Sequence, residues 1–149
     1  MFKKTIFIFL FFLIFNSAVQ TKELKITSDR LEVDRDKKIS TFIGNVYLYE
    51  KDMEIWADKI IVKFSDNEEK VNELHAENNV KIVRESIVAF SDSGTYYPLE
   101  EILELYNNVE VTENGNLLRC DELILDIVNS RSIMRSNSSD RVEALIINN

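Results

Sequence analysis

Residues 107–121, NNVEVTENGNLLRCD, hold two apolar segments on either side of a turn signal, and they end in an aspartate. Asn114-Gly115 is the turn signal, because both residues tolerate positive φ and suit the type I′ turn of a tight hairpin. A frame of Asn-Val followed by Asp, with twelve residues from Val to Asp, occurs three times. Its members are Val46 and Asp58, Val80 and Asp92, and Val109 and Asp121. Equal spacings predict a repeated structural unit rather than a single site.

Each repeat is predicted to consist of two β-strands joined by a tight turn. Apolar and polar residues alternate through nearly the whole chain after its N-terminal segment, and no long stretch has the period of a helix. The first strands of the three copies share predicted inward positions, which are Phe42, Ala76 and Leu105; Gly44, Asn78 and Asn107; Val46, Val80 and Val109; and Leu48, Ile82 and Val111. Lys51-Asp52 and Glu85-Ser86 take the place of Asn114-Gly115 in the other two copies.

The second strand of each repeat changes its apolar face at an aspartate. Ile55 and Ala57 share one parity of alternation, whereas Ile60 and Val62 share the other, and the switch falls at Asp58. Because a strand keeps one apolar face with period two, a slip of one residue predicts a bulge or corner. Aspartate suits a corner, since its carboxylate can accept hydrogen bonds from nearby backbone N–H groups. The four predicted corner residues are Asp29, Asp58, Asp92 and Asp121.

Corners at one level in every unit predict an all-β fold in which an antiparallel sheet is folded over, as a β-jelly-roll or a flattened β-solenoid-like prism. Apolar residues on both sides of the corners then face one interior. The predicted interior residues are Val46, Leu48, Ile60, Val62, Phe64, Val80, Ile82, Val109, Val111, Leu123 and Leu125. Val142 and Leu145 repeat the spacing of Val71 and Leu74, so we expect a partial fourth unit to start there.

Residues 1–18 are predicted to be a secretory signal peptide, and residues 19–149 a single domain. Lys3 and Lys4 form a basic start, residues 5–15 are apolar after Thr5, and Ala18 offers a cleavage site. The run is shorter than the roughly 20 residues of a membrane span, so an uncleaved anchor is the less favoured alternative. Cleavage would leave 16 of the 18 basic residues against 26 acidic ones, a net charge of −10. Such an acidic domain is a poor match for nucleic-acid phosphates.

Histidine and cysteine, which serve many catalytic and metal sites, occur once each in the chain. His75 is the only histidine, and its outward parity favours an exposed, solvated side chain over a ligand or a base. Cys120 is the only cysteine, and it aligns with Ala57 and Ser91 at a position that favours a small side chain. We therefore predict no catalytic residue, no metal and no cofactor, and we interpret the corner aspartates as structural rather than as calcium ligands.

Three segments resemble the OstA-like domain family of lipopolysaccharide-transport proteins. They are ITSDRLEVD at residues 26–34, STFIGNVYLYEKDMEIWADKIIVKF at residues 40–64, and NNV with CDELILDI within residues 107–127. The combined pattern S-D-x-L-x-V-D, F-x-G-N-V and A-D-x-I-x-V is fairly specific to this domain. Within the family, the chain length and the predicted signal favour an LptA-type member, and a membrane-anchored LptC-type member is the alternative.

The resemblance implies a β-jelly-roll with an apolar groove, and a non-catalytic periplasmic carrier that shields the acyl chains of lipid A between the inner and outer membranes. The implied partners are lipopolysaccharide, an LptC-like inner-membrane protein, an LptD-like outer-membrane protein, and further copies joined head to tail. Such partners would pair with unpaired edge strands. We expect these edges around residues 24–33 and 141–147.

Alternatives from other functional classes stay open on the sequence. A carbohydrate-active β-solenoid enzyme would use paired carboxylates and would show turnover. A structural β-filament would assemble without binding lipid. The apolar residues could also fill a closed core instead of lining a groove, and only a gap between the two sides of the folded sheet would separate these two interpretations.

Overall fold

The computed structural model describes residues 23–67, 70–137 and 139–147, so the predicted signal peptide, residues 1–18, lies outside the described residues. Every regular element in the described part of the chain is a strand, and no helix there could cross a membrane. The strands are β1 (Leu24–Thr27), β2 (Arg30–Asp34), β3 (Ile39–Glu50), β4 (Met53–Phe64), β5 (Val71–Arg84), β6 (Ile87–Tyr97), β7 (Ile102–Glu113), β8 (Asn116–Asp126), β9 (Arg131–Arg135) and β10 (Glu143–Leu145).

The ten strands form one antiparallel sheet in which neighbours along the chain are mostly neighbours in space. The order is β1-β3-β4-β5-β6-β7-β8-β10, with β2 also paired to β3 and β9 also paired to β8. Short hairpins can connect antiparallel neighbours, so this order needs no long crossover connection. The all-β fold of repeated two-strand units is confirmed.

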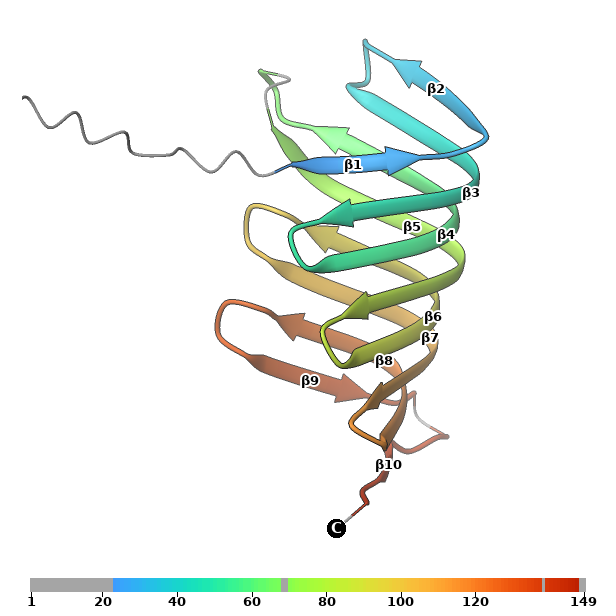
Figure 1. Cartoon of the computed structure of the whole chain (residues 1–149), viewed down its shortest axis with the longest axis vertical. Helices are drawn as coiled ribbons and strands as arrows, with labels where there is room; N and C mark the ends of the chain where they lie inside the picture. Colours follow the sequence, from blue (N-terminus) through green and yellow to red (C-terminus); the bar gives the residue numbers. More distant parts are fainter. Residues whose placement is uncertain (1–22, 68–69, 138, 148–149) are drawn as a thin grey trace, which may run out of the picture.

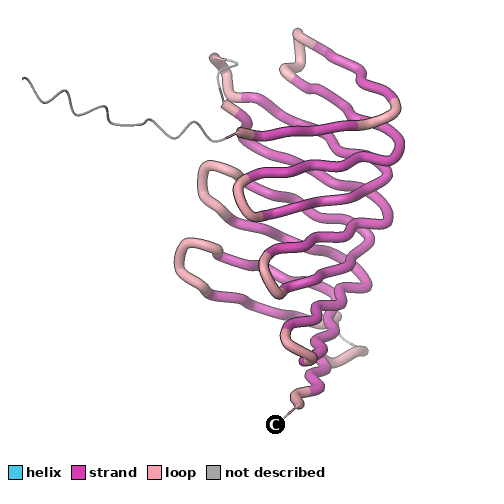
Figure 2. The backbone as a smooth tube through the Cα atoms, in the orientation of Figure 1, coloured by secondary structure: helices cyan, strands magenta, loops and turns pink. Residues whose placement is uncertain are grey.

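The sheet is folded over on itself, and each long strand runs through the bend from one layer into the other (Figures 1 and 2). We name the layers by their first strands. The β1 flap contains β1, β10 and residues 46–50, 53–57, 80–84, 87–91, 109–113 and 116–120. The β2 flap contains β2, β9 and residues 39–43, 59–64, 71–77, 93–97, 102–106 and 122–126. The interior lies between the two flaps.

The bend is made by a two-residue bulge in β3, β5 and β7. Pairing with the following strand shifts between Ile43 and Val46, between Glu77 and Val80, and between Tyr106 and Val109. The residues of the three bulges all have φ between 46° and 82°, and they are Gly44 and Asn45, Asn78 and Asn79, and Asn107 and Asn108. Glycine and asparagine are the residues that enter this left-handed region most readily. The register places one aspartate of the next strand opposite each bulge.

The bulges correct one prediction about the interior. Gly44, Asn78 and Asn107 were expected to point inward, but Asn78 and Asn107 are exposed and Gly44 is half-buried. The prediction was wrong because two consecutive left-handed residues turn the backbone out of the simple alternation. The two bulge residues leave the residues before and after them in the same alternation. The spacing of apolar residues in the sequence therefore does not reveal this turn.

The fourth unit also differs from the prediction. Val142 and Leu145 were matched to Val71 and Leu74, which belong to the β2 flap, but β10 pairs with Leu117–Arg119 of β8 in the β1 flap. The β2-flap strand of this unit is β9, which pairs with residues 122–126. Val142 and Leu145 are exposed. The described residues between β9 and β10, 136–137 and 139–142, form no strand, so the apolar spacing there did not identify the unit.

The hairpin turns at the tips of the β1 flap lie where the sequence placed them. Asn114 and Gly115 have φ of 49° and 85°, the signs that a type I′ turn requires. Lys51 and Glu85 begin the other two turns with φ of 54° and 52°. Residues 98–101 form the turn between β6 and β7 in the β2 flap.

Candidate functional site

The interior between the flaps is the candidate site, and all eleven predicted interior residues lie in it. Nine of them are buried, and Phe64 and Leu125 are partly buried against the same cluster. Ala76 and Leu105, which were predicted to point inward, also belong to this cluster, whereas Met53, Leu74 and Leu103 belong to it without having been predicted. The same period-two alternation within these strands was the signal that could have found them.

The interior is not equally filled along its length. Around Leu48, Ile60 and Leu74, the space left between the flaps is about 10 Å³, which is at the lower limit for one water molecule. Closer to the C-terminal strands lies a cavity of about 160 Å³. Its lining is mainly apolar and comes from β4 to β9. Exposed Glu113 and Ser132 are among its lining residues, so the cavity reaches the surface at the open rim, or lip, of the flaps.

Charged residues occupy the last inward position of the β1 flap. Glu50, Arg84 and Glu113 end β3, β5 and β7, and each lies two residues beyond a buried apolar residue. Arg84 forms an ion pair with Asp52 of the preceding turn at 3.0 Å. This row of charged residues was not predicted, although the alternation along β3, β5 and β7 directs these three side chains inward.

Two polar contacts involve residues from both flaps. Lys51, in the β3–β4 turn of the β1 flap, forms an ion pair with Glu101, in the β6–β7 turn of the β2 flap. Deeper in the interior, Tyr96 of the β2 flap hydrogen-bonds to Glu50 of the β1 flap. Burial raises the pKa of the Tyr96 hydroxyl, and the nearby negative charges of Glu50 and Glu101 raise it further. Tyr96 therefore stays a neutral hydrogen-bond donor across the physiological pH range.

The predicted corner aspartates each hold the following unit at the fold line. Asp29, Asp58 and Asp92 accept hydrogen bonds of 2.7–2.8 Å from the side-chain amides of Asn45, Asn79 and Asn108. Asp121 instead accepts a bond of 2.7 Å from the backbone N–H of Asn137. The expected bonds to backbone N–H groups are thus replaced by asparagine amides at three of the four corners. No three His, Cys, Asp or Glu residues among those described are placed to hold a metal ion.

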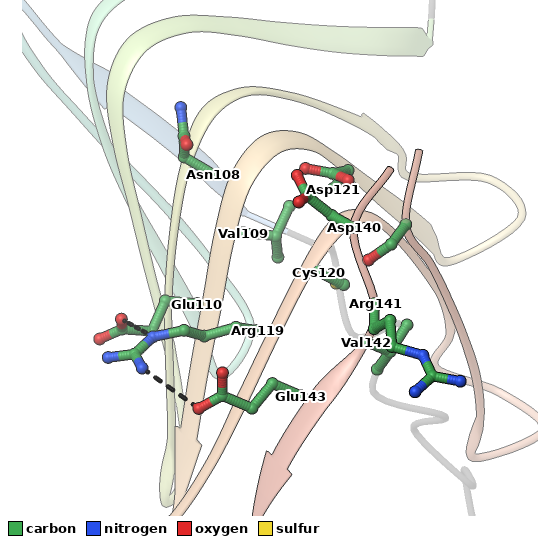
Figure 3. Close-up of a pocket in the computed structure, with 11 residues that line it drawn as sticks. Asn108, Val109, Glu110, Arg119, Cys120, Asp121, Asp140, Arg141, Val142 and Glu143 are labelled. Carbon is green, nitrogen blue, oxygen red and sulfur yellow. Dashed lines mark hydrogen bonds and ion pairs between the residues drawn. The ribbon is translucent and has the colours of Figure 1, made fainter. Parts of the chain in front are cut away.

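A hollow of about 620 Å³ lies beside the fourth corner, and it is larger than the interior cavity. Figure 3 shows its lining, in which Arg119 reaches Glu110 and Glu143 at 3.0 and 3.5 Å. Its other charged residues are Asp121, Asp140 and Arg141. An acyl chain gains less from this charged, open surface than from the mainly apolar interior, because hydrophobic binding depends on removing apolar area from water. We therefore place the candidate site in the smaller interior cavity.

His75 and Cys120, the two residues best suited to catalysis or metal binding, are both shielded by the fold. His75 was expected to be solvated, but it is half-buried, and its Nδ1 lies 3.0 Å from the Thr95 hydroxyl. Glu77 lies 3.7 Å from its Nε2 atom. The prediction was wrong because neighbouring strands flank the outer face of β5 and shield it. Cys120 is buried, and burial raises the pKa of its thiol, which makes the reactive thiolate scarcer at neutral pH.

The arrangement offers a mainly apolar space between two flaps, and a lip that carries charged side chains. A family model described as "LptA/(LptD N-terminal domain) LPS transport protein" matches residues 25–131. The chain belongs to this family. Its folded-over antiparallel sheet is the β-jelly-roll-like fold of an LptA-like protein, as the resemblance implied.

Two individual proteins are similar to this chain. The crystal structure of LptH, described as the LptA homologous periplasmic component of the conserved lipopolysaccharide transport device from Pseudomonas aeruginosa, superposes with a TM-score of 0.76. The match covers 85% of this chain and 96% of LptH at 13% identity, so it shows the fold. The uncharacterised protein RP507 of Rickettsia prowazekii (strain Madrid E) is 25% identical over 115 residues, which are 74% of this chain and 79% of RP507.

Proposed function

We propose that this LptA-like chain is a non-catalytic periplasmic carrier that holds the acyl chains of lipid A while lipopolysaccharide passes from the inner to the outer membrane. The observation that carries the proposal is an apolar interior that contains a cavity of about 160 Å³ open at the lip. Membership of a lipopolysaccharide-transport family supports the substrate class. The periplasmic description of LptH, which has the same fold, supports the compartment.

The energetics of acyl chains explain the need for such an interior. Each methylene exposed to water costs about 0.8 kcal/mol, so several acyl chains cannot cross an aqueous compartment unshielded. A cavity of 160 Å³ resembles the engineered cavity of about 150 Å³ that binds benzene, and it is smaller than the roughly 300–1,000 Å³ of typical ligand pockets. The flaps must therefore part further to hold a whole chain. The half-buried Leu118, Leu125 and Met134 lie where this widening would begin.

The two ends of the sheet supply surfaces for partners. β1 and β2 form the N-terminal edge, and β9 and β10 form the C-terminal edge. Leu31 and Val33 are 52% and 59% exposed on β2, so the apolar interior is uncovered at this end. Edge strands accept further strands by β-augmentation. We propose that copies of the chain, an LptC-like inner-membrane protein and an LptD-like outer-membrane protein dock head to tail at these edges.

Photo-crosslinking in cells that make lipopolysaccharide tests the carrier function. A diazirine-bearing aliphatic residue replaces Leu125, which lines the cavity, or its neighbour Ile124, which has the opposite parity on β8. We expect an adduct that an antibody against lipid A detects at position 125 and not at position 124. Export and resistance to protease show that each variant is folded.

Equal adducts at both positions, or none at position 125 in a folded and exported protein, would contradict binding between the flaps. A folded protein without an adduct at position 125 would favour a structural filament or an enzyme. Turnover of a glycan that is lost when an acidic residue is replaced would then identify the enzyme.

A further inference from the structure

We propose that a polar clasp across the lips divides the interior into two compartments, and that acyl chains bind preferentially in the C-terminal one. We define the clasp as Glu50, Lys51, Tyr96 and Glu101. The closed compartment lies around Leu48, Ile60 and Leu74, and the open compartment is the cavity around Leu118, Leu125 and Met134. Chains that enter from the open compartment reach the closed one only when the clasp opens. This inference rests on the carrier function proposed above.

The outer part of the clasp joins the tips of the two flaps. Lys51 and Glu101 lie 50 positions apart in the chain and belong to turns on opposite sides of the interior. Their side chains are 39% and 20% exposed, so the ion pair is partly shielded from water and closes the rim at this point. The ion pair holds the β3–β4 hairpin against the β6–β7 hairpin, and a chain entering between these tips would have to separate its two charges.

The inner part of the clasp places polar atoms where apolar packing would be expected. Glu50 and Tyr96 are only 5% and 4% exposed, and they face each other from opposite flaps. Glu50 continues the inward series of Val46 and Leu48, so the alternation that builds the interior directs a carboxylate into it. A hydrogen bond to a charged acceptor is strong in a low-dielectric setting, and it does not form with an acyl chain. The pair therefore favours closure and discourages lipid here.

The clasp lies at the boundary between the compartments. Tyr96 lines the tight space next to Leu48 and Leu74, whereas its strand neighbour Leu103 lines both the tight space and the cavity. On the side of Tyr96 away from Leu103, the next residue across the sheet is Leu74, which pairs with Tyr96. The residue after that is Val62, which pairs with Leu74. A lipid chain that contacts Val62 after entering from the cavity has therefore passed the clasp.

The turn sequences show why the clasp forms at this hairpin. The position of Lys51 is taken by Glu85 in the next hairpin and by Asn114 in the one after it. Neither residue carries the positive charge that pairs with Glu101. Arg84, at the matched position of Glu50, pairs with Asp52 of its own flap instead. The next two hairpins along the sheet thus lack a cation at the turn position that Lys51 occupies.

The test measures lipid crosslinking at Val62, which is 1% exposed, in the full chain expressed in cells that make lipopolysaccharide. A small diazirine residue replaces Val62, and Lys63 with the opposite parity is the outward control. Lys51→Glu opposes Glu101 with a like charge. Glutamate is compatible with this turn position, because Glu85 occupies the equivalent one with nearly the same φ. The double variant Lys51→Glu with Glu101→Lys restores the attraction.

We expect Lys51→Glu to raise the adduct at Val62 about three-fold, the size of effect that loss of a partly exposed ion pair gives. The double variant should return the adduct to the wild-type yield, and the adduct at Leu125 should change little. Lys37→Glu makes the same charge change at the exposed Lys37–Asp34 pair and should leave the adduct at Val62 unaltered. Tyr96→Phe, which keeps the ring, is a second way to open the clasp.

The outcomes separate the clasp from the carrier function. An adduct at Leu125, with a yield at Val62 that neither Lys51→Glu nor Tyr96→Phe increases, overturns the clasp and leaves the carrier intact. A folded protein with no adduct at Leu125 removes the carrier function and the clasp together. A rise at Val62 that Lys37→Glu reproduces also overturns the clasp, because the effect would then come from net charge.

Discussion

The interior around Leu48 and the interior around Leu125 arise from the same alternating strands, yet one is packed and the other is hollow. Leu48 is completely buried, whereas Leu125 is partly exposed beside a cavity of about 160 Å³. Strands β4 to β7 have full-length neighbours on both sides, and β1 and β2 together cover the outer side of β3, so their inward side chains meet partners on both sides. Beside β8 the last unit contributes only β9 with five residues and β10 with three. A short last unit leaves the final interior layer incomplete.

The comparison shows that alternation alone does not determine whether an apolar interior is closed. Alternation directs side chains inward, but the distance between the flaps depends on what covers the layer and what joins the lips. In the N-terminal half, complete neighbours and the clasp bring the flaps together. In the C-terminal half, both features are missing near β8 and β9, and the interior stays accessible. The cavity thus lies where the repeat is unfinished.

The largest expected difference between the halves is in the cost of losing a leucine. Leu48→Ala should lower the free energy of unfolding by about 3 kcal/mol or more, because it leaves a cavity in a fully packed layer. Leu125→Ala should cost about 1–2 kcal/mol, since its side chain is partly exposed and borders an existing cavity. Urea unfolding of both variants measures the two values. Similar losses would mean that the C-terminal layer is as tightly packed as the other.

Replacing an alanine by leucine should lower the stability of the protein in the N-terminal half and raise it in the C-terminal half. Ala76→Leu forces extra carbons into a space of about 10 Å³ and should destabilise the protein by about 1–3 kcal/mol. Ala89→Leu places the same carbons into the 160 Å³ cavity and should raise stability by about 1 kcal/mol. Thermal and urea unfolding compare the two variants.

The enlarged residue at position 89 should also exclude lipid. Ala89→Leu should lower the lipid adduct at Leu125, because both residues line the same cavity. Destabilisation by both enlarged variants, or an unchanged adduct in a stable Ala89→Leu protein, would count against a preformed acyl-chain cavity.

The sequence predicted the fold in detail where one local pattern decides it. The parity switch at Asp58 located the fold line, and Asn114-Gly115 located a hairpin tip, because alternation and turn geometry are local properties. The bend made by Asn78 and Asn79 was missed, since a pair of left-handed residues preserves the parity of the residues around it.

The division of the interior could not be predicted from the sequence. The inward direction of Glu50 follows from its strand, but its partner Tyr96 belongs to another flap and another repeat. Nothing local to either residue indicates that they meet. The cavity likewise depends on how short β9 and β10 are, and the irregular segment between them carries no clear period.

The smallest expected effect concerns the alkaline stability of the closed half. Burial and the Glu50 carboxylate raise the pKa of Tyr96 above the value of about 10 of an unfolded tyrosine. The stabilisation from this hydroxyl is fully present below pH 10 and is lost as pH rises through the raised pKa of the folded state. Tyr96→Phe should therefore cost about 1 kcal/mol at pH 8, the value of one hydrogen bond, and less at pH 10.5.

Chemical unfolding of the wild type and Tyr96→Phe at both pH values measures how far the difference in their free energies of unfolding shrinks. Tyr49→Phe is the control, because it removes an exposed hydroxyl from the outward side of the strand that carries Glu50. This variant retains Tyr96, so its stability should fall between pH 8 and pH 10.5 as that of the wild type does. A stability gap between the wild type and Tyr96→Phe that stays constant from pH 8 to pH 10.5 would show that the hydroxyl does not titrate with unfolding. The Glu50–Tyr96 contact would then add nothing to the closure of the N-terminal half, and that closure would rest on apolar packing and the Lys51–Glu101 ion pair.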